Sequence, residues 1–172
     1  MTTAEIATLL DKQAITEVIY RYCRGLDRMD REMALSVWSP GATVDYRGMF
    51  TGTGEGFVDW VWEAHTALAS HSHQISNILI DVAPAGVENT AHSEAYVTAT
   101  LRAEPDPTTS VDIVARGRYL DEWTKLDGRW EIAHRIFVMD VQSMYQMPSE
   151  AVAGTRTGTR DRLDLSYDLF AT

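Results

Sequence analysis

The chain has 172 residues, 45% of them apolar and 23% charged, which is the balance of a soluble globular protein with one domain. Its net charge of −10 disfavours nucleic acid and anionic membrane surfaces as partners, because most of the surface would repel phosphate groups. The sequence has no apolar run long enough for a transmembrane helix and no secretory signal pattern, so we expect a cytoplasmic protein. Cys23 is the single cysteine, which excludes a disulfide within the chain and favours a packed apolar role.

Helical patterns dominate the first part of the chain. Residues 3–26 place apolar side chains three and four positions apart, which predicts a long amphipathic helix. Asp30 is expected to cap a short second helix that runs to about Trp38. Residues 42–46 alternate like a strand, and residues 57–69 predict a third helix with one apolar face.

Strand patterns dominate the second part, over residues 73–82, 90–103, 111–125 and 130–141. The pair Asp127-Gly128 predicts a tight hairpin turn between the last two strands. Helices followed by an antiparallel meander predict an α+β domain over residues 1–145. We expect residues 146–172 to be an extension that packs on the body or on a partner subunit. In the second strand, alternation assigns small and apolar residues to the concave face of the sheet: Ala91, Ser93, Ala95, Val97, Ala99 and Leu101.

Two residues far apart in the sequence are candidates for proton transfer. Removing a proton beside a carbonyl or a leaving group requires a base that titrates near neutral pH, and histidine is such a base. A carboxylate on the far ring nitrogen fixes the tautomer and stabilises the imidazolium that forms. His73 and Asp27 could form such a dyad. From the residues alone, the favoured interpretations are a satisfied core histidine for His73 and a turn residue at the end of a helix for Asp27.

Five other polar residues require interpretation. His71 and His73 form a His-x-His pair, but no cysteine or carboxylate lies at supporting spacing, so we expect no metal site. Arg135 and His134 point to opposite faces of the last strand, so one of them faces inward, where an arginine would need an anion or a polarised oxygen as partner. Tyr46 and Tyr119 could fill the core or point their phenols into a pocket.

The element order and two short segments carry a resemblance to a known family. The segments are Gly117-Arg118-Tyr119 and residues 127–132, and the likeness covers about residues 5–145. The chain resembles the NTF2-like superfamily, also called SnoaL-like. This resemblance implies a cone in which N-terminal helices pack on a strongly curved mixed or antiparallel β-sheet that encloses a pocket.

Within that superfamily the chain looks most like scytalone dehydratase and hexachlorocyclohexane dehydrochlorinase. Asp27 and His73 match the catalytic dyad of both enzymes. Tyr46 lies in the triplet Asp45-Tyr46-Arg47, which matches the triplet whose tyrosine helps to hold a water on the substrate carbonyl in the dehydratase. Arg135 lies where the dehydrochlorinase has a pocket arginine.

The chain also departs from these enzymes in the residues that contact the substrate. Leu26 stands in place of a second water-holding tyrosine, and the apolar stretch 95–99 stands in place of a second pocket histidine. Tyr119 replaces a pocket asparagine of the dehydratase, and Tyr22 replaces a lysine of the dehydrochlorinase. We therefore expect Tyr22 and Tyr119 to contact the substrate together with Tyr46 and Arg135, but the identity of the substrate does not transfer.

The resemblance implies a cofactor-free lyase that performs a dehydratase-type elimination on a small hydrophobic cyclic molecule. An isomerase of the ketosteroid type would use nearly the same dyad. A non-catalytic small-ligand binder, or a protein like the β-subunit of ring-hydroxylating dioxygenases, would use the same fold. The resemblance implies no cofactor.

The outer face of the sheet predicts a homo-oligomer, either a dimer or a trimer. The outward residues Tyr96, Thr98 and Thr100 carry no charge, whereas a solvated sheet face usually carries more Lys and Glu. In the simplest arrangement, Arg116 or Arg118 pairs across a two-fold axis with an acidic residue of the partner, the candidates being Glu94 and Glu122.

Overall fold

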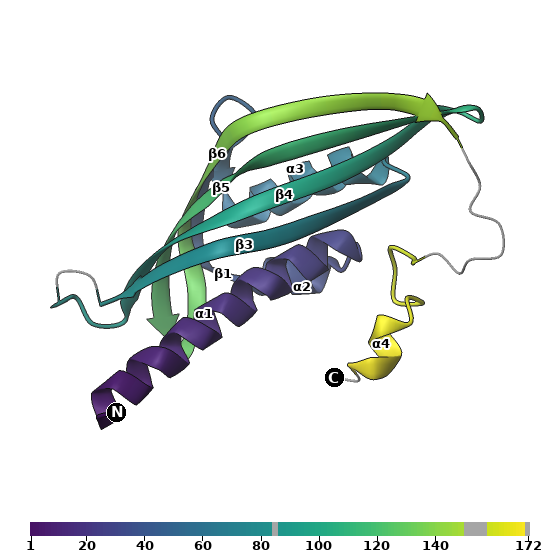
Figure 1. Ribbon diagram of the computed structural model, residues 1–172. Helices are drawn as coiled ribbons and strands as arrows, with labels where there is room; N and C mark the ends of the chain where they lie inside the picture. Colours follow the sequence, from purple (N-terminus) through teal and green to yellow (C-terminus); the bar gives the residue numbers. More distant parts are fainter. Residues whose placement is uncertain (84–85, 150–157, 171–172) are drawn as a thin grey trace.

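The structure is a computed structural model that describes residues 1–83, 86–149 and 158–170. Its helices are α1 (Thr3–Asp27), α2 (Arg31–Leu35), α3 (Gly54–Thr66) and α4 (Ser166–Leu169). Its strands are β1 (Trp38–Asp45), β2 (Thr51–Thr53), β3 (Ser70–Val82), β4 (Thr90–Asp106), β5 (Thr109–Leu126) and β6 (Arg129–Pro148). This order confirms the predicted α+β class, with helices first and a meander after them (Figure 1).

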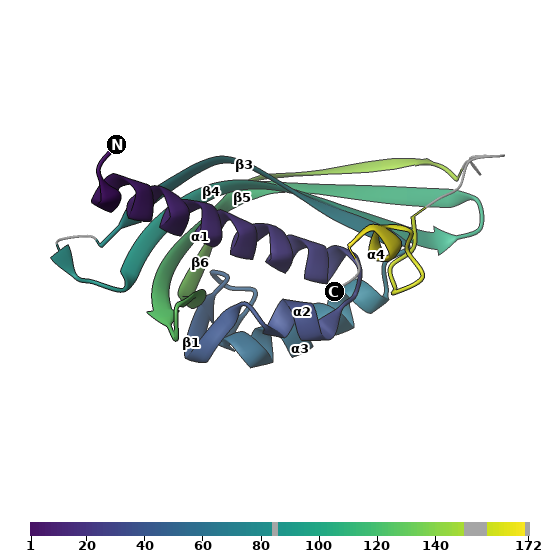
Figure 2. The ribbon, with the colours of Figure 1, turned by 90° about the horizontal axis from the view of Figure 1, so that it is seen from below.

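The six strands form one curved sheet in the order β2-β1-β6-β5-β4-β3. Strands β3 to β6 pair as an antiparallel meander, whereas β1 runs parallel to β6, so the sheet is mixed. At the β5–β6 hairpin, Asp127 and Gly128 both have positive φ angles, 50° and 80°, as the predicted tight turn requires. Helices α1, α2 and α3 all lie on the concave face of the sheet (Figure 2).

Two features favour helix α1: a capping motif at its N-terminus and an apolar stripe along one face. The Thr2 side chain accepts from the Glu5 amide while the Glu5 carboxylate accepts from the Thr2 amide, which is a capping box. The stripe buries its C-terminal half against the sheet, through Ile15, Val18, Ile19, Tyr22, Cys23 and Leu26. The stripe therefore fixes the C-terminal end of α1, including Asp27, beside β3.

No helix among the described residues is long and apolar enough to cross a membrane.

The second helix is shorter than its sequence predicts. Asp30 caps α2 as expected, by accepting from the Met33 amide at 3.1 Å, but the helix ends at Leu35. Trp38 instead begins β1, because this segment hydrogen-bonds to the edge of β6, and the Ile132 amide donates to the Val37 carbonyl at 2.8 Å. Pairing with a distant strand thus overrides the local helical preference.

A bulge in β6 places two of its residues on one face. Trp123 of β5 pairs with Ile132 and Glu122 pairs with His134, so Ala133 is an extra residue in β6. Simple alternation predicts that Ile132 and Arg135 face opposite ways, but both are fully buried. The bulge therefore brings Arg135 to the helix-covered face without exposing Ile132.

The described part of the C-terminal extension packs beside the end of α1. The Arg24 guanidinium donates to the Ser166 hydroxyl at 3.1 Å, and the Tyr167 hydroxyl donates to the Asp30 carboxylate at 2.9 Å. Arg160 donates to the carbonyls at the C-terminal end of α3, including that of His65 at 2.8 Å. Residues 150–157, which fall within the predicted extension, lie outside the described part of the chain.

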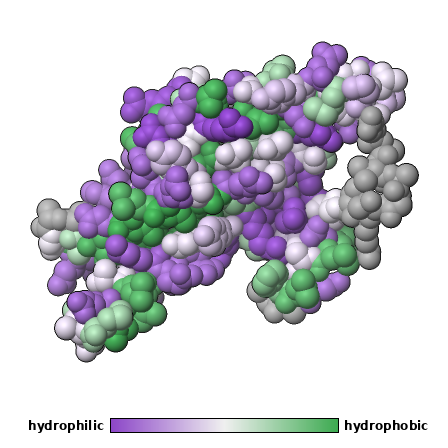
Figure 3. All heavy atoms as spheres, in the orientation of Figure 1, coloured by the Kyte–Doolittle hydropathy of each residue, from purple (hydrophilic) through white to green (hydrophobic). Residues whose placement is uncertain are grey.

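The outer face of the sheet carries a mixture of apolar and paired charged groups. Arg118 contacts Glu94 at 3.2 Å and Asp140 at 3.0 Å, so its charge is already paired within the chain. Apolar side chains reach the surface along β3 and on the C-terminal segment (Figure 3), where Leu79 and Leu163 are 72% and 84% exposed. The predicted pairing of Arg118 across a two-fold axis would have to compete with these internal contacts, and oligomerisation stays a prediction.

Candidate active site

A cavity of about 270 Å³ lies between α1, α3 and the concave face of the sheet, and the family resemblance implies such a pocket enclosed by the sheet. Its wall is mostly apolar, and six of its residues carry aromatic rings: Tyr22, Tyr46, Phe57, Trp60, Tyr119 and Phe137. The predicted small residues of β4 lie as expected, since Val97 and Ala99 line the cavity and Ala95, which does not line it, is fully buried. An apolar cavity of this kind suits a small hydrophobic ligand.

His73 and Asp27 meet at one end of this cavity. The His73 Nδ1 lies 2.7 Å from the Asp27 Oδ1, and the His73 backbone amide donates to the Asp27 Oδ2 at 3.0 Å. Because a carboxylate only accepts, the proton of the neutral imidazole sits on Nδ1, and the lone pair of Nε2 is left for other partners. His73 lines the cavity and its side chain is 6% exposed. The two residues therefore have the geometry of an oriented base.

His71 has a different environment from His73, although both side chains face the concave side. The His71 Nε2 lies 2.8 Å from the Leu26 carbonyl, so Nε2 carries the proton, and Nδ1 accepts from Arg160 at 3.4 Å. Burial lowers the pKa of His71, which agrees with a neutral ring. Since both nitrogens are engaged, His71 joins the end of α1 to the C-terminal segment.

Tyrosine hydroxyls supply polar groups elsewhere in the cavity wall. The hydroxyls of Tyr22 and Tyr46 lie 3.2 Å apart, so one donates to the other. Tyr46 also stacks on Phe137, with ring centroids 4.9 Å apart. Burial raises the pKa of Tyr22, Tyr46 and Tyr119 well above the ordinary value, so all three remain phenols that can donate a hydrogen bond.

Arg135 lies behind the tyrosines and is not among the residues that line the cavity. Its guanidinium makes two hydrogen bonds of 2.7 Å to Asp121, and neither side chain is exposed. The guanidinium carbon lies 4.3 Å from the Tyr22 ring centroid and 4.0 Å from that of Tyr119. The sequence predicts that Arg135 contacts the substrate. Asp121 occupies its Nε and Nη2, whereas its buried Nη1 has no partner among the described residues, so direct contact stays a prediction. Burial opposes its charge, yet Asp121 keeps the pKa of Arg135 well above the ordinary value.

The structure brings in one residue that the sequence analysis did not identify. His65 of α3 lines the cavity, and its ring centroid lies 5.9 Å from that of His73 and 4.3 Å from that of His71. Helical spacing in the sequence could have identified His65 as an inward-facing residue, because it follows Val61 by four residues and Phe57 by eight. Three histidine rings therefore gather at this end of the cavity. Within the described residues, no group of three or more His, Cys, Asp or Glu side chains is arranged to hold a metal ion.

Comparison with known proteins agrees with this architecture. The SnoaL-like domain family matches residues 7–136. The chain belongs to the SnoaL-like family, within the NTF2-like superfamily. A comparison with curated proteins finds no match.

Solved structures of similar proteins share the SnoaL-like fold. A proposed scytalone dehydratase from Novosphingobium aromaticivorans aligns with a TM-score of 0.70 and 24% identity, over 87% of this chain and 97% of its own. A hexachlorocyclohexane dehydrochlorinase from Novosphingobium barchaimii aligns with a TM-score of 0.67 and 16% identity, over 89% of this chain and 99% of its own. A protein of unknown function from Mycobacterium tuberculosis aligns with a TM-score of 0.67 and 19% identity, over 81% and 77%. These identities are low, so the likeness shows a shared fold.

A second cavity, of about 560 Å³, lies on the other side of the dyad in this SnoaL-like domain. Asp27 and His73 belong to its wall. Its other charged and aromatic residues come from α1, its C-cap and the C-terminal segment: Glu17, Tyr20, Arg21, Arg24, Arg28, Tyr167 and Phe170. The dyad therefore separates an apolar cavity from one rich in arginine.

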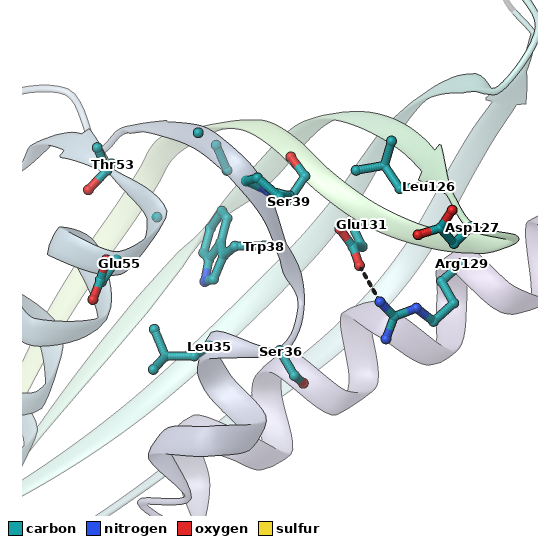
Figure 4. A pocket seen from close by; sticks show the side chains of 14 residues that line it. Leu35, Ser36, Trp38, Ser39, Thr53, Glu55, Leu126, Asp127, Arg129 and Glu131 are labelled. Carbon is teal, nitrogen blue, oxygen red and sulfur yellow. Dashed lines mark ion pairs between the residues drawn. The ribbon is translucent and has the colours of Figure 1, made fainter.

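A third and larger cavity, of about 630 Å³, lies away from the dyad. Figure 4 shows the Trp38 ring below Ser39 on one side, and the Glu131 carboxylate facing Arg129 on the other, at 3.4 Å. None of the site residues predicted from the sequence lines this cavity. The residues that line it include no histidine held by a carboxylate, so the apolar cavity with the dyad is the better candidate for an active site.

Proposed function

We propose that this protein is a cofactor-free lyase that eliminates water from a small hydrophobic cyclic hydroxy ketone. The observation that carries the proposal is the His73–Asp27 contact of 2.7 Å at the end of an apolar cavity. Enzymes named as a dehydratase and a dehydrochlorinase among the structural neighbours support an elimination as the reaction. The cavity is large enough for one ring or two fused rings, since about 270 Å³ is the volume that roughly nine water molecules occupy in liquid water.

In the proposed reaction His73 takes a proton from the carbon beside the ketone through Nε2. The electrons of that C–H bond form the new C=C bond, and the C–O bond of the hydroxyl group breaks. The imidazolium returns the proton to the departing oxygen, so water leaves and His73 regains its starting form. Asp27 accepts from the Nδ1–H throughout and stabilises the transient positive charge.

The tyrosines are suited to hold the ketone oxygen. Tyr22 and Tyr46 form a hydroxyl pair, and both line the cavity. As the proton leaves the carbon, negative charge develops on the carbonyl oxygen, and a donor aimed at that oxygen lowers the barrier. Tyr119 lines the same wall. In this proposal Arg135 acts only behind the tyrosines, through its contacts with their rings.

A panel of cyclic hydroxy ketones tests the proposal, and 3-hydroxy-1-tetralone is the first member. Its elimination yields 1-naphthol, which is followed by ultraviolet absorbance. The wild type should form 1-naphthol faster than buffer, whereas His73→Ala should reduce the rate to background. A His92→Phe variant, which removes an exposed histidine from the outer face, should behave as the wild type. Equal rates for wild type and His73→Ala across the panel would exclude the proposed base.

A second candidate function is binding without chemistry. The six aromatic rings of the cavity wall could hold a ring compound whether or not His73 takes a proton. In that case wild type and His73→Ala would both bind the hydroxy ketones, and neither would release product.

A further inference from the structure

His65 is a buried polar side chain that the proposed reaction leaves without a role. It is 6% exposed, lines the cavity beside His73 and comes from a different element, α3. Its Nδ1 is enclosed and has no hydrogen-bond partner among the described residues. A buried imidazole ring that makes no hydrogen bond costs free energy, so such a ring at a cavity wall points to a ligand that bonds its accessible nitrogen.

The surroundings of His65 fix which nitrogen can meet a ligand. Because Nδ1 is enclosed, Nε2 is the nitrogen that the cavity can reach. A buried N–H with no acceptor is rarer in proteins than a buried lone pair with no donor, so the proton belongs on Nε2. His65 therefore presents an N–H donor to the cavity, whereas His73 presents a lone pair, since its proton is held on Nδ1 by Asp27.

His65 also stays neutral next to the base. Burial is the main cause of a pKa lowered to about 3, and the neighbouring His71, His73 and Arg160 contribute to the same shift. Because His65 is a neutral donor, it adds no positive charge beside the His73 ring, which must become an imidazolium when it takes up the proton.

We propose that His65 contacts the ligand and donates a hydrogen bond through Nε2–H to the hydroxyl oxygen of a cyclic hydroxy ketone. The inference rests on the proposed function for the chemistry of that oxygen, and it narrows the substrate class to ring compounds with two oxygens. The ketone oxygen lies at the tyrosine hydroxyls, and the hydroxyl oxygen lies between His65 and His73. Tyr22 precedes Asp27 by five residues on α1, which separates the two polar regions by about 7 Å along the helix axis.

Binding measurements test this inference without any turnover. The experiment compares 3-hydroxy-1-tetralone with 1-tetralone, which lacks the hydroxyl, in a His73→Ala background, with Kd taken from quenching of tryptophan fluorescence. With His65 present, the hydroxy ketone should bind about fivefold more tightly than the ketone. His65→Phe, which keeps a ring but no donor, should reduce this ratio to about one and leave the affinity for 1-tetralone unchanged. His65→Gln, whose amide nitrogen replaces Nε2, should retain most of the ratio, and His92→Phe should retain all of it.

Three results would overturn the inference. The first is a hydroxyl preference that persists in His65→Phe, because the donor would then lie elsewhere. The second is an equal weakening of both ketones in His65→Phe, which would assign His65 to the shape of the cavity. The third is no binding of the hydroxy ketone in the His73→Ala background. A hydroxyl preference that depends on His65, together with no elimination by the wild type, would support the inference and refute only the proposed lyase activity.

Discussion

The buried pair Arg135–Asp121 predicts a large and specific loss of stability. The perturbation is Arg135→Met, which keeps an unbranched apolar chain and removes the guanidinium. Asp121 would lose both of its 2.7 Å hydrogen bonds while it remains 3% exposed, so its carboxylate would be buried without a partner. The rings of Tyr22 and Tyr119 would also lose the cation that lies between them.

The magnitude follows from the burial of both partners. Removal of one member of a buried ion pair costs about 3–5 kcal/mol, against a total stability of about 5–15 kcal/mol for a typical domain. For a chain of this length, each kcal/mol lowers the Tm by about 2–4 °C, so the variant should melt about 6–20 °C below the wild type. Arg135→Met/Asp121→Leu removes both charges, and it should unfold within about 2 kcal/mol of the wild type.

Urea unfolding, followed by tryptophan fluorescence, measures these differences through the midpoint and the slope of the transition. An exposed pair provides the matched control: Arg47→Met removes a guanidinium that is 3.4 Å from Asp45 and 68% exposed, and it should change the stability by less than about 1 kcal/mol. A loss below about 1 kcal/mol in Arg135→Met would refute the reasoning. A double variant that is less stable than the single variant would refute it as well.

Three further predictions follow from the same structure. Asp27→Asn should leave the fold intact and lower kcat/KM for elimination by about 10²- to 10⁴-fold, because an amide can hold the His73 ring in the wrong tautomer. Steady-state kinetics measure the loss of activity, and a urea unfolding curve checks that the fold is intact. An unchanged kcat/KM would contradict this prediction. Burial lowers the pKa of His65 to about 3, so between about pH 6.5 and pH 3 the unfolded chain binds this proton more readily than the folded protein does. The free energy of unfolding should therefore fall by about 2 kcal/mol from pH 7 to pH 5 because of this residue alone. His65→Phe should remove that part of the pH dependence in urea titrations, and an unchanged slope would contradict the assignment. Sedimentation at micromolar concentration should show a dimer or a trimer, and a monomer would contradict the predicted association.

The helices and strands of the cone follow from periodicity, because long regular patterns leave little choice of structure. The burial of Val97 and the turn at Asp127-Gly128 are predictable for this reason. Trp38 is not, since its strand conformation depends on pairing with β6, which is remote in the sequence. Arg135 is a related case, because the bulge at Ala133 changes which residues share a face, and alternation alone cannot indicate a bulge.

The residues of the candidate site were predictable only where each one matches a residue of the family pattern. His73 and Asp27 are 46 positions apart, and no local spacing indicates that they meet, so the resemblance supplied the pairing and the structure supplies the distance. His65 has no equivalent pattern, and near the end of a helix it resembles an ordinary polar residue. Its position on the Phe57 and Val61 face was visible in the sequence, but its unpartnered Nδ1 required coordinates.

Hydrogen–deuterium exchange in 1-tetralone tests the central claim most directly, because it reports proton removal by His73 without any leaving group. In deuterated buffer the wild type should exchange the protons on the carbon beside the ketone faster than buffer alone, as measured by proton NMR. His73→Ala should show only the background rate, and His92→Phe should match the wild type. Exchange at the background rate with the wild type, or equal exchange by the wild type and His73→Ala, would contradict the account.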